Sequence, residues 1–341
     1  MAKVLVAMSG GVDSSVAAAL MIEAGHDVTG VTLKLWGGEQ DSGCCSVSDV
    51  EDARRVAAQL DVPHYVFNFR EAFDEEIVDP YVAAYAAGTT PNPCIECNRT
   101  MKWGRLLERS DQLGFEYLVT GHHACIVDTP HGLRLGRGDD ASKDQSYVLY
   151  MLSESQLART LLPVGHMTKP QVRAIATRLG LRTASKAESM DVCFITKGGR
   201  DAFLAARVPR APGDIVSVDG SHLGQHPGVD RFTIGQRRGL GVAVGDRRYV
   251  VDINAAEQVV TIGERRDLLR ESVALRDMDF ATGRPNSEQV LVAQTRAHGQ
   301  AMPCRLVGDE VLWQTPQPRV APGQVVVLYD GDVVVGGGIT R

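Results

Sequence analysis

The first third of the chain alternates between strand-like and helix-like patterns of apolar residues. Apolar runs predict buried strands at residues 3–8, 27–36, 64–69 and 116–123. Between them, residues 13–25 and 48–61 have helical periodicity, with Gly25 at the end of the first helix and Ser48 or Asp49 as N-cap of the second. Strands that alternate with helices predict a parallel sheet covered on both faces. Ligands bind to such sheets at the carboxyl ends of the strands.

The pattern changes near residue 205, beyond which glycines, prolines and short β-rich runs follow one another. The last run, residues 323–339, favours a small antiparallel barrel or sandwich. A second change falls between residues 265 and 275. We therefore predict an α/β protein with three domains, at residues 1–205, 206–270 and 271–341.

Composition is compatible with this division. The chain has 341 residues, of which 44% are hydrophobic and 23% charged, an ordinary globular balance. No window approaches the roughly 20 apolar residues of a membrane helix. The N-terminal apolar run has the pattern of a first strand, not of a signal peptide. We expect a cytoplasmic protein with no membrane association.

Charge and cysteine content narrow the function. The net charge of 36 − 42 = −6 argues against bulk attraction to nucleic acid but leaves room for a local basic patch. In a reducing compartment, an odd number of cysteines argues against a structural disulfide framework, so any disulfide should be transient and catalytic. The seven cysteines are Cys44, Cys45, Cys94, Cys97, Cys125, Cys193 and Cys304. We interpret Cys44 and Cys45 as structural or incidental, and Cys125 and Cys304 as small core residues.

The string SGGVDSS, residues 9–15, follows the first predicted strand and opens the first predicted helix. Gly10 and Gly11 allow the backbone to approach a ligand without side-chain clash. The serines supply hydroxyl donors, and the helix start supplies unpaired N–H groups and a positive dipole end. These features predict a phosphate cradle that lacks the Walker pattern. Asp13 is a candidate magnesium ligand or helix-start residue.

This string resembles the signature of the PP-loop ATP pyrophosphatases. The resemblance implies that the protein binds ATP and cleaves it between the α- and β-phosphates, giving an adenylated substrate and pyrophosphate. It does not choose the acceptor, because members activate carboxyl or carbonyl oxygens or thiolate RNA.

Five motifs in order narrow the acceptor. They are TPNPCIECNRTMKWGRL (90–106), TGHHA (120–124), KDQSYVLY (143–150), SMDVCFI (189–195) and FTIGQRRGLG (232–241). The series resembles the bacterial tRNA-specific 2-thiouridylases over almost the whole chain. That resemblance implies a PP-loop catalytic domain, a small central tRNA-binding domain and a C-terminal β-barrel. It also implies ATP-dependent 2-thiolation of the wobble uridine of tRNA, with release of AMP and pyrophosphate.

The same resemblance assigns roles to two cysteines. Cys97 is the implied nucleophile, and Cys193 is the implied carrier of a persulfide sulfur. A transient Cys97–Cys193 disulfide would then form and require reduction. A thiolate is the working form of either group, and Arg99, Lys102 and a helix predicted after Cys97 would favour it.

The resemblance further implies ATP and Mg²⁺ as cofactors, the tRNAs for Lys, Glu and Gln as substrates, and a persulfide donor such as a cysteine desulfurase or relay protein. The implied ATP site comprises Ala7, Met8, Ser9, Gly10, Gly11, Val12, Asp13, Ser14, Leu33 and Gly121. The implied tRNA contacts are Asn92, Pro93, Cys94, His122, Lys143, Asp144, Gln145, Arg296, Ala297 and Gln324.

The sequence departs from the family at two of these positions. Cys94 stands where much of the family has aspartate, so an acid–base role there does not carry over unchanged. Ala297 stands where an aromatic residue is common. Cys94, Cys97 and Cys193 could instead ligate a 4Fe–4S cluster with one iron left open for sulfide. We predict no zinc site at this pair, because no second C-x-x-C or histidine pair lies nearby.

Two other function classes remain as alternatives. A PP-loop amidoligase would need an ammonia source and no cysteines, which the cysteine motifs disfavour. A non-catalytic tRNA-binding protein would tolerate damage to SGGVDSS or loss of Cys97, and neither is present.

Overall fold

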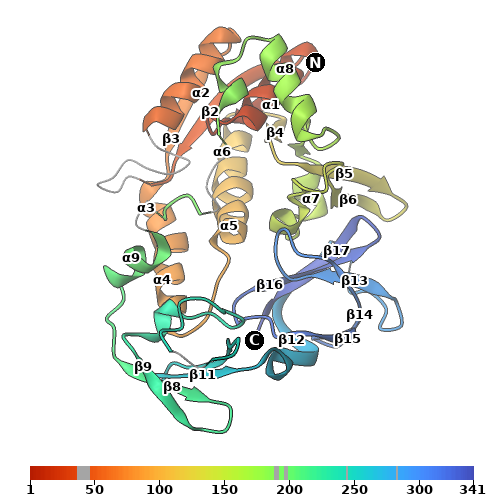
Figure 1. Cartoon of the computed structure of the whole chain (residues 1–341). Coiled ribbons are helices and arrows are strands. Elements are labelled where there is room, and N and C mark those ends of the chain that lie inside the picture. Colours follow the sequence, from red (N-terminus) through yellow and green to blue (C-terminus); the bar gives the residue numbers. More distant parts are fainter. Residues whose placement is uncertain (37–46, 188–191, 196–198, 243–244, 282) are drawn as a thin grey trace.

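The computed structural model describes almost the whole chain as three connected regions (Figure 1). The described residues are 1–36, 47–187, 192–195, 199–242, 245–281 and 283–341. Cys44 and Cys45 lie outside them, so our interpretation of that pair stays a prediction. No helix in the described ranges is long and apolar enough to cross a membrane.

The N-terminal region contains a five-stranded parallel sheet in the order β3-β2-β1-β4-β7. Its strands are β1 (Lys3–Ala7), β2 (Asp27–Lys34), β3 (His64–Asn68), β4 (Tyr117–Val119) and β7 (Thr160–Leu161). The predicted parallel sheet is therefore confirmed. In β1, Val4 and Val6 pack into the core on one face, and Leu5 packs into the core on the other. The short apolar run has no polar alternation because both faces are covered.

Helices cover both faces of this sheet. On one face α1 (Val12–Glu23), α2 (Val47–Gln59) and α8 (Lys169–Arg178) enclose a compact core. On the other face lie two unbroken helical segments that contain π-helical turns. The first comprises α3 (Arg70–Phe73), η1 (Asp74–Val78) and α4 (Asp79–Ala86), and the second α5 (Pro93–Glu96), η2 (Cys97–Leu106) and α6 (Leu107–Gln112).

Our predicted N-cap of the second helix is wrong. Because α2 is already helical at Val47, Ser48 and Asp49 lie in its first turn. The Asp49 carboxylate instead accepts a hydrogen bond from Lys186 Nζ at 2.7 Å. The Asp49 side chain, which the local sequence pattern assigned to an N-cap, therefore forms an ionic contact with a residue far away in the sequence.

The central region is a four-stranded sheet in the order β10-β11-β8-β9, with its own apolar core. Its strands are β8 (Gly213–Ser217), β9 (His222–His226), β10 (Tyr249–Asn254) and β11 (Val259–Gly263), and α9 (Gly199–Ala205) precedes them. The remaining helical elements are short turns within and between the regions. They are η3 (Ser146–Leu149), α7 (Glu154–Leu157), η4 (Arg182–Ser185), η5 (Val229–Arg231) and η6 (Arg265–Leu268).

The C-terminal region is an antiparallel barrel of six strands, closed by the pairing of β12 with β17. The strands are β12 (Leu269–Phe280), β13 (Leu291–Gln294), β14 (Met302–Val307), β15 (Glu310–Pro318), β16 (Val325–Asp330) and β17 (Val333–Thr340). The predicted barrel is confirmed, while the exact domain boundaries stay predictions. A hairpin from the N-terminal region, β5 (Ala124–Thr129) and β6 (Gly132–Arg137), joins this sheet where Gly136 pairs with Val333.

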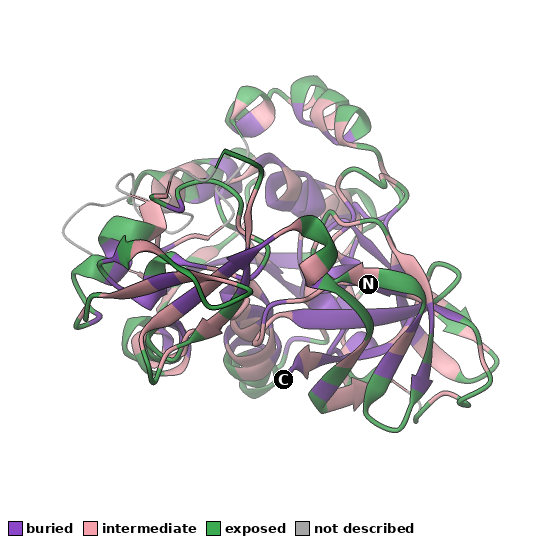
Figure 2. Ribbon diagram, turned by 60° about the horizontal axis from the view of Figure 1, so that its bottom comes forward, coloured by how far each residue is buried: buried purple, intermediate pink, exposed green. Residues whose placement is uncertain are grey.

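The barrel packs firmly against the N-terminal region. Tyr329 from β16 lies in the same buried core as Met101 and Tyr147. Thr90 N donates to Pro322 O at 2.7 Å, and Gln324 Nε2 donates to Thr90 O at 2.6 Å. Figure 2 shows buried residues along the strands of all three regions and exposed residues mainly on loops and outer helix faces. The barrel thus fixes the segment that leads into the PNPCIECN motif.

Candidate functional site

The SGGVDSS loop connects β1 to α1 at the carboxyl edge of the parallel sheet, as predicted. Gly10 has a φ of +73°, and a Cβ there would lie 2.3 Å from Asp49 O. Gly11 is the N-cap residue of α1. Ser14 Oγ lies 3.2 Å from Ser9 N and accepts its hydrogen bond. The loop is therefore wound tightly over the helix start, with the α1 N-terminus at its base.

Neighbouring strands complete the rim of this loop. A Cβ on Gly121, which follows β4, would lie 2.5 Å from Ser14 N, so only glycine fits there. Met8 N donates to Val31 O at 2.7 Å, which ties the loop to β2. Leu33, two residues further along β2, is buried in the core. The structure thus brings Met8, Ser14 and Gly121 together at one sheet edge.

Asp13 is the charged residue of the loop, and a lysine and a histidine hold it. Lys169 Nζ donates to both carboxylate oxygens, at 2.8 and 2.6 Å, and His123 Nε2 lies 3.2 Å from Oδ1. Burial alone would raise the pKa of Asp13, but the hydrogen bonds from His123 and Lys169 hold it below its ordinary value. Sequence reasoning missed Lys169 because it lies 156 positions away. The Lys169 ammonium therefore lies beside the predicted phosphate loop.

A second lysine, Lys186, binds the backbone of the same loop and two carboxylates of α2. Lys186 Nζ donates to Gly10 O at 3.0 Å, to Asp49 Oδ1 at 2.7 Å and to Asp52 Oδ2 at 2.6 Å. Burial opposes the charged form, but the bonds to both carboxylates raise the pKa of Lys186 above its ordinary value. Lys186 precedes Cys193 by seven positions in the sequence.

Cys97 is the first residue of η2, and the helical segment begins four residues earlier at Pro93. The prediction that a helix starts after Cys97 is therefore wrong. Asn92 Oδ1 accepts from Cys94 N at 3.1 Å, which makes Asn92 the N-cap and Pro93 the first helical residue. The unpaired N–H groups of the helix start consequently lie nearer Cys94 than Cys97. The Asn-Pro pair was a usable signal for this start.

The π-helical turn beginning at Cys97 affects which side chains share its side of the helix. A π-helix bonds residue i to residue i+5, so Lys102 lies one turn from Cys97 on nearly the same side. Lys102 Nζ lies 3.3 Å from His122 Nε2. Arg99 is committed elsewhere, because its guanidinium contacts Asp279 Oδ2 of β12 at 2.8 Å. Of the two basic residues, Lys102 therefore shares a side of the helix with Cys97, whereas Arg99 is held by the barrel.

Cys193 lies in the described island 192–195 and is half-buried. Its neighbour Phe194 is 1% exposed and packs edge-on against Tyr81 at a centroid distance of 5.2 Å. Burial first, then Tyr85 and the Cys94 thiol, raise the pKa of Tyr81. Cys97 and Cys193 both pack against the core that contains these aromatic rings.

His122 is a buried polar residue at the end of β4. Its Nδ1 lies 2.8 Å from Thr120 Oγ1 and its Nε2 faces the Lys102 ammonium, which can only donate. Nε2 is therefore the acceptor, and Nδ1–H donates to Thr120. Burial, and then the charge of Lys102, lower the pKa of His122 well below its ordinary value of 6.5.

This pKa predicts an acid-sensitive fold. The folded protein keeps His122 neutral where the unfolded chain binds a proton, so its contribution to stability is complete above about pH 6.5 and declines as pH falls. In urea unfolding between pH 7.5 and 5.5, His122→Gln should reduce the pH dependence of the unfolding free energy by up to about 1.4 kcal/mol per pH unit. An unchanged slope in that variant would contradict this assignment.

Asp144 organises the loop of residues 143–145 that is predicted to contact tRNA. Asp144 is 4% exposed, and its carboxylate accepts from Arg137, Gly138 N and Ser146 N. Gln145 Oε1 accepts from His123 N at 2.9 Å. Asp144 therefore shapes the loop that presents Lys143. Pro93, His122 and Asp144 are buried, so tRNA contact by their side chains stays a prediction.

Arg296 and Gln324, the two barrel side chains predicted to contact tRNA, have different surroundings. Arg296 is exposed on the turn after β13, where Gln294 Nε2 donates to the carbonyls of Arg296 and Ala297. Gln324 is committed to Thr90 O, so its side chain joins barrel and PNPCIECN segment. Arg296 is thus available on the surface, whereas Gln324 serves the domain contact.

Comparisons with known proteins cover the whole chain. Residues 2–197 match the family described as tRNA methyl transferase HUP domain, 201–264 the tRNA methyl transferase PRC-barrel domain, and 270–340 the Aminomethyltransferase beta-barrel domain. A solved 4-thiouridine synthetase–RNA complex with bound ATP shares 19% identity, with a TM-score of 0.40, over 61% of this chain and 46% of that chain. That likeness is too low to carry an argument.

Full-length relatives have one name in common. The chain is 46% identical to tRNA-specific 2-thiouridylase MnmA of Roseiflexus sp. (strain RS-1), over 99% of both chains. It is equally 46% identical to the proteins of that name from Herpetosiphon aurantiacus, over 99% of this chain and 98% of the relative, and Moorella thermoacetica, over 98% of both. Although the family models mention methyl transfer, the relatives that align from end to end are thiouridylases. The chain therefore belongs to the tRNA-specific 2-thiouridylase family.

Proposed function

We propose that this protein is a tRNA-uridine 2-sulfurtransferase that uses ATP to replace the C2 oxygen of the wobble uridine by sulfur. One observation carries the proposal beyond family membership. Ala7 at the entrance of the phosphate loop, Cys97 and Cys193 all pack against the same apolar core. An activating site for ATP and two sulfur atoms therefore border one region of the fold, which is what a two-step thiolation needs.

In the first step, the uridine C2 oxygen attacks the α-phosphorus of ATP and pyrophosphate leaves. The proposed ATP site is the loop from Ala7 to Ser14 with Leu33 and Gly121, where backbone N–H groups and the α1 N-terminus stabilise phosphate charge. Lys169 adds a cation held at 2.6 Å from Asp13. Mg²⁺ usually binds one or two carboxylates plus substrate phosphates, and Asp13 is the carboxylate that could hold it here. The metal would neutralise phosphate charge.

In the second step, the terminal sulfur of a Cys193 persulfide attacks C2, and AMP departs with the former C2 oxygen. The Cys97 thiolate then attacks Cys193 Sγ, which breaks the S–S bond and leaves the terminal sulfur on C2. A Cys97–Cys193 disulfide results, and a thiol reductant supplies the two electrons that reopen it. Extrusion of the base from the anticodon stack would deliver C2 to this site.

We propose the tRNAs for Lys, Glu and Gln as substrates, and a cysteine desulfurase or a relay protein as persulfide donor. Lys143 and Arg296 are the proposed phosphate contacts on two separate loops. The iron–sulfur alternative has one feature in its favour, because Cys94 and Cys97 are three positions apart in one helical segment and share a side of it.

The purified protein should convert unmodified transcripts of these tRNAs to 2-thiouridine when given ATP, Mg²⁺ and a desulfurase with cysteine. Mass spectrometry of digested nucleosides measures the product, and pyrophosphate release should match it. A transcript with cytidine at the wobble position is the matched control. ATP turnover on another acceptor without any 2-thiouridine, or methylated uridine formed from S-adenosylmethionine, would overturn the proposal.

A further inference from the structure

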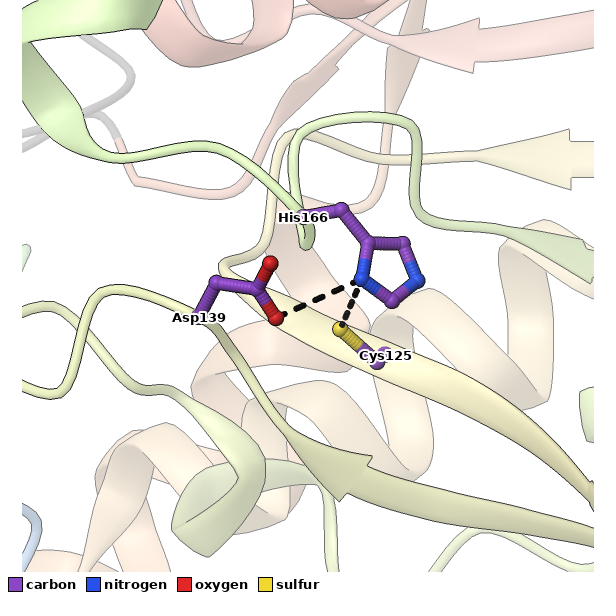
Figure 3. A group of neighbouring side chains, drawn as sticks. All are labelled: Cys125, Asp139 and His166. Atoms are coloured by element: carbon purple, nitrogen blue, oxygen red, sulfur yellow. Dashed lines mark hydrogen bonds and ion pairs between the residues drawn. The ribbon is translucent and has the colours of Figure 1, made fainter.

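Three side chains with metal-ligating atoms converge at a group that contains neither Cys97 nor Cys193 (Figure 3). Cys125 comes from β5, Asp139 follows β6, and His166 follows β7. His166 Nδ1 lies 3.4 Å from Cys125 Sγ and 3.3 Å from Asp139 Oδ1. The three ligand atoms all lie within 4.8 Å of one another. Sequence analysis missed the group because its members are 14 and 27 positions apart with no shared motif (139 − 125 = 14, 166 − 139 = 27).

We propose that Cys125, Asp139 and His166 form a binding site for a zinc-class divalent cation. Thiolate, imidazole and carboxylate are the three zinc ligands that proteins use. With metal–ligand bonds of about 2.0–2.3 Å at tetrahedral angles, neighbouring ligand atoms are roughly 3.3–3.6 Å apart. The two separations at His166 Nδ1 already have that length. Water would complete the coordination on the solvent side, because Cys125 is buried whereas Asp139 and His166 are exposed.

Two polar atoms of the group compete for one nitrogen. His166 Nδ1 lies within hydrogen-bond distance of both Cys125 Sγ and Asp139 Oδ1, and it can accept from the thiol or donate to the carboxylate, but not both at once. A divalent cation that displaces the thiol proton would bind all three ligand atoms together.

The backbone around the group is fixed before any metal arrives. A Cβ on Gly165 would lie 2.0 Å from Ala124 O, so the His166 turn packs directly on β5. Asp139 N donates to Gly165 O at 2.9 Å, which joins the segment that carries Asp139 to the turn that carries His166. Preorganised segments reduce the ordering cost of binding a metal through three ligands.

The position of the group gives the cation a structural consequence. Asp140, beside the ligand Asp139, accepts from Lys169 N at 2.9 Å, and Lys169 Nζ holds Asp13 of the phosphate loop. The same loop continues to Lys143, a proposed tRNA contact. A bound cation would therefore stabilise the contact between the N-terminus of α8 at Lys169 and the loop that contains Asp140 and Lys143. Metal binding itself does not depend on the thiolation activity.

The full-length protein, stripped of metal with chelator and dialysed, tests this directly. Titration with Co²⁺ should produce a thiolate-to-metal absorption band with a stoichiometry of one, and Zn²⁺ should displace it. Cys125→Ser and His166→Ala should each weaken Zn²⁺ binding by at least about 100-fold. His166 is exposed, so its variant keeps the test valid if Cys125→Ser folds poorly. Cys304→Ser, which removes a buried cysteine of the barrel, is the matched control and should keep the band.

Two results would overturn the site. The first is the absence of any cobalt–thiolate band in the folded wild-type protein. The second is a band that survives both Cys125→Ser and His166→Ala but disappears in Cys97→Ser, because the metal would then belong to the other cysteines.

Discussion

Replacement of Cys193 by serine is expected to reduce 2-thiouridine formation by at least about a thousandfold, to background. A serine hydroxyl cannot carry the persulfide sulfur, so no nucleophile reaches the activated C2. The fold should survive, because the neighbouring Phe194 supplies the buried anchor of this segment and is untouched. Nucleoside mass spectrometry measures the loss. Cys304→Ser, at a buried position in the barrel, should keep the activity.

Cys97→Ser should stop the same reaction one step later. The terminal sulfur can still attack C2, but the S–S bond to Cys193 then lacks its resolving thiolate. Enzyme and tRNA should accumulate as a covalent adduct that migrates apart from both on a denaturing gel. Dithiothreitol should cleave its S–S bond and release tRNA that contains 2-thiouridine. A covalent adduct between tRNA and the Cys193→Ser variant, or full activity of the Cys193→Ser variant, would contradict the proposed roles of Cys193 as sulfur carrier and Cys97 as resolving thiolate.

Cys94→Ser separates the disulfide route from the iron–sulfur route. Cys94 takes no part in the proposed persulfide steps, so the disulfide route predicts that most activity remains in air. A cluster held by Cys94, Cys97 and Cys193 predicts instead that the variant loses both iron and activity after anaerobic purification. Iron analysis of wild type and variant, prepared side by side, decides between them.

Local sequence pattern predicted those parts of the fold that depend on neighbouring residues. The parallel sheet followed from short apolar runs, because residues such as Val4, Leu5 and Val6 are at most 1% exposed and face two covered layers. The phosphate loop followed from Gly10 and Gly11 between a strand and a helix. The barrel followed from alternating β-rich runs after residue 270. In each case the signal and the structure occupy the same stretch of chain.

Contacts between distant segments left no such signal. Lys169 and Lys186 reach the phosphate loop across more than 150 positions (169 − 13 = 156, 186 − 10 = 176), and nothing in their own neighbourhoods marks a phosphate partner. Asp144 has the pattern of a surface loop residue, yet four hydrogen bonds from Arg137, Gly138 and Ser146 bury it. The pairing of β6 with β17 likewise depends on how the barrel docks. Such features follow from tertiary packing and not from periodicity.

Gly10→Ala is expected to weaken ATP binding by at least about 100-fold, a loss of roughly 2.7 kcal/mol. Two costs combine at this position. Its φ of +73° disfavours any L side chain by about 1–2 kcal/mol. In addition, the new methyl would lie 2.3 Å from Asp49 O, a backbone atom that cannot rotate away. Relief of that clash must move either the loop or α2, and both movements disturb the Lys186 bonds to Gly10 O and Asp49.

Gly25→Ala is the matched control for this prediction. Its φ of +79° carries the same conformational cost, but a Cβ there meets nothing within 4 Å. Both variants should therefore lose about 1–2 kcal/mol of unfolding free energy from backbone strain in urea denaturation, and Gly10→Ala should lose more because of its clash. Only Gly10→Ala should lose ATP affinity in calorimetric titration. Equal ATP affinities in the two variants would mean that the close approach of the phosphate loop to α2 does not shape the nucleotide site.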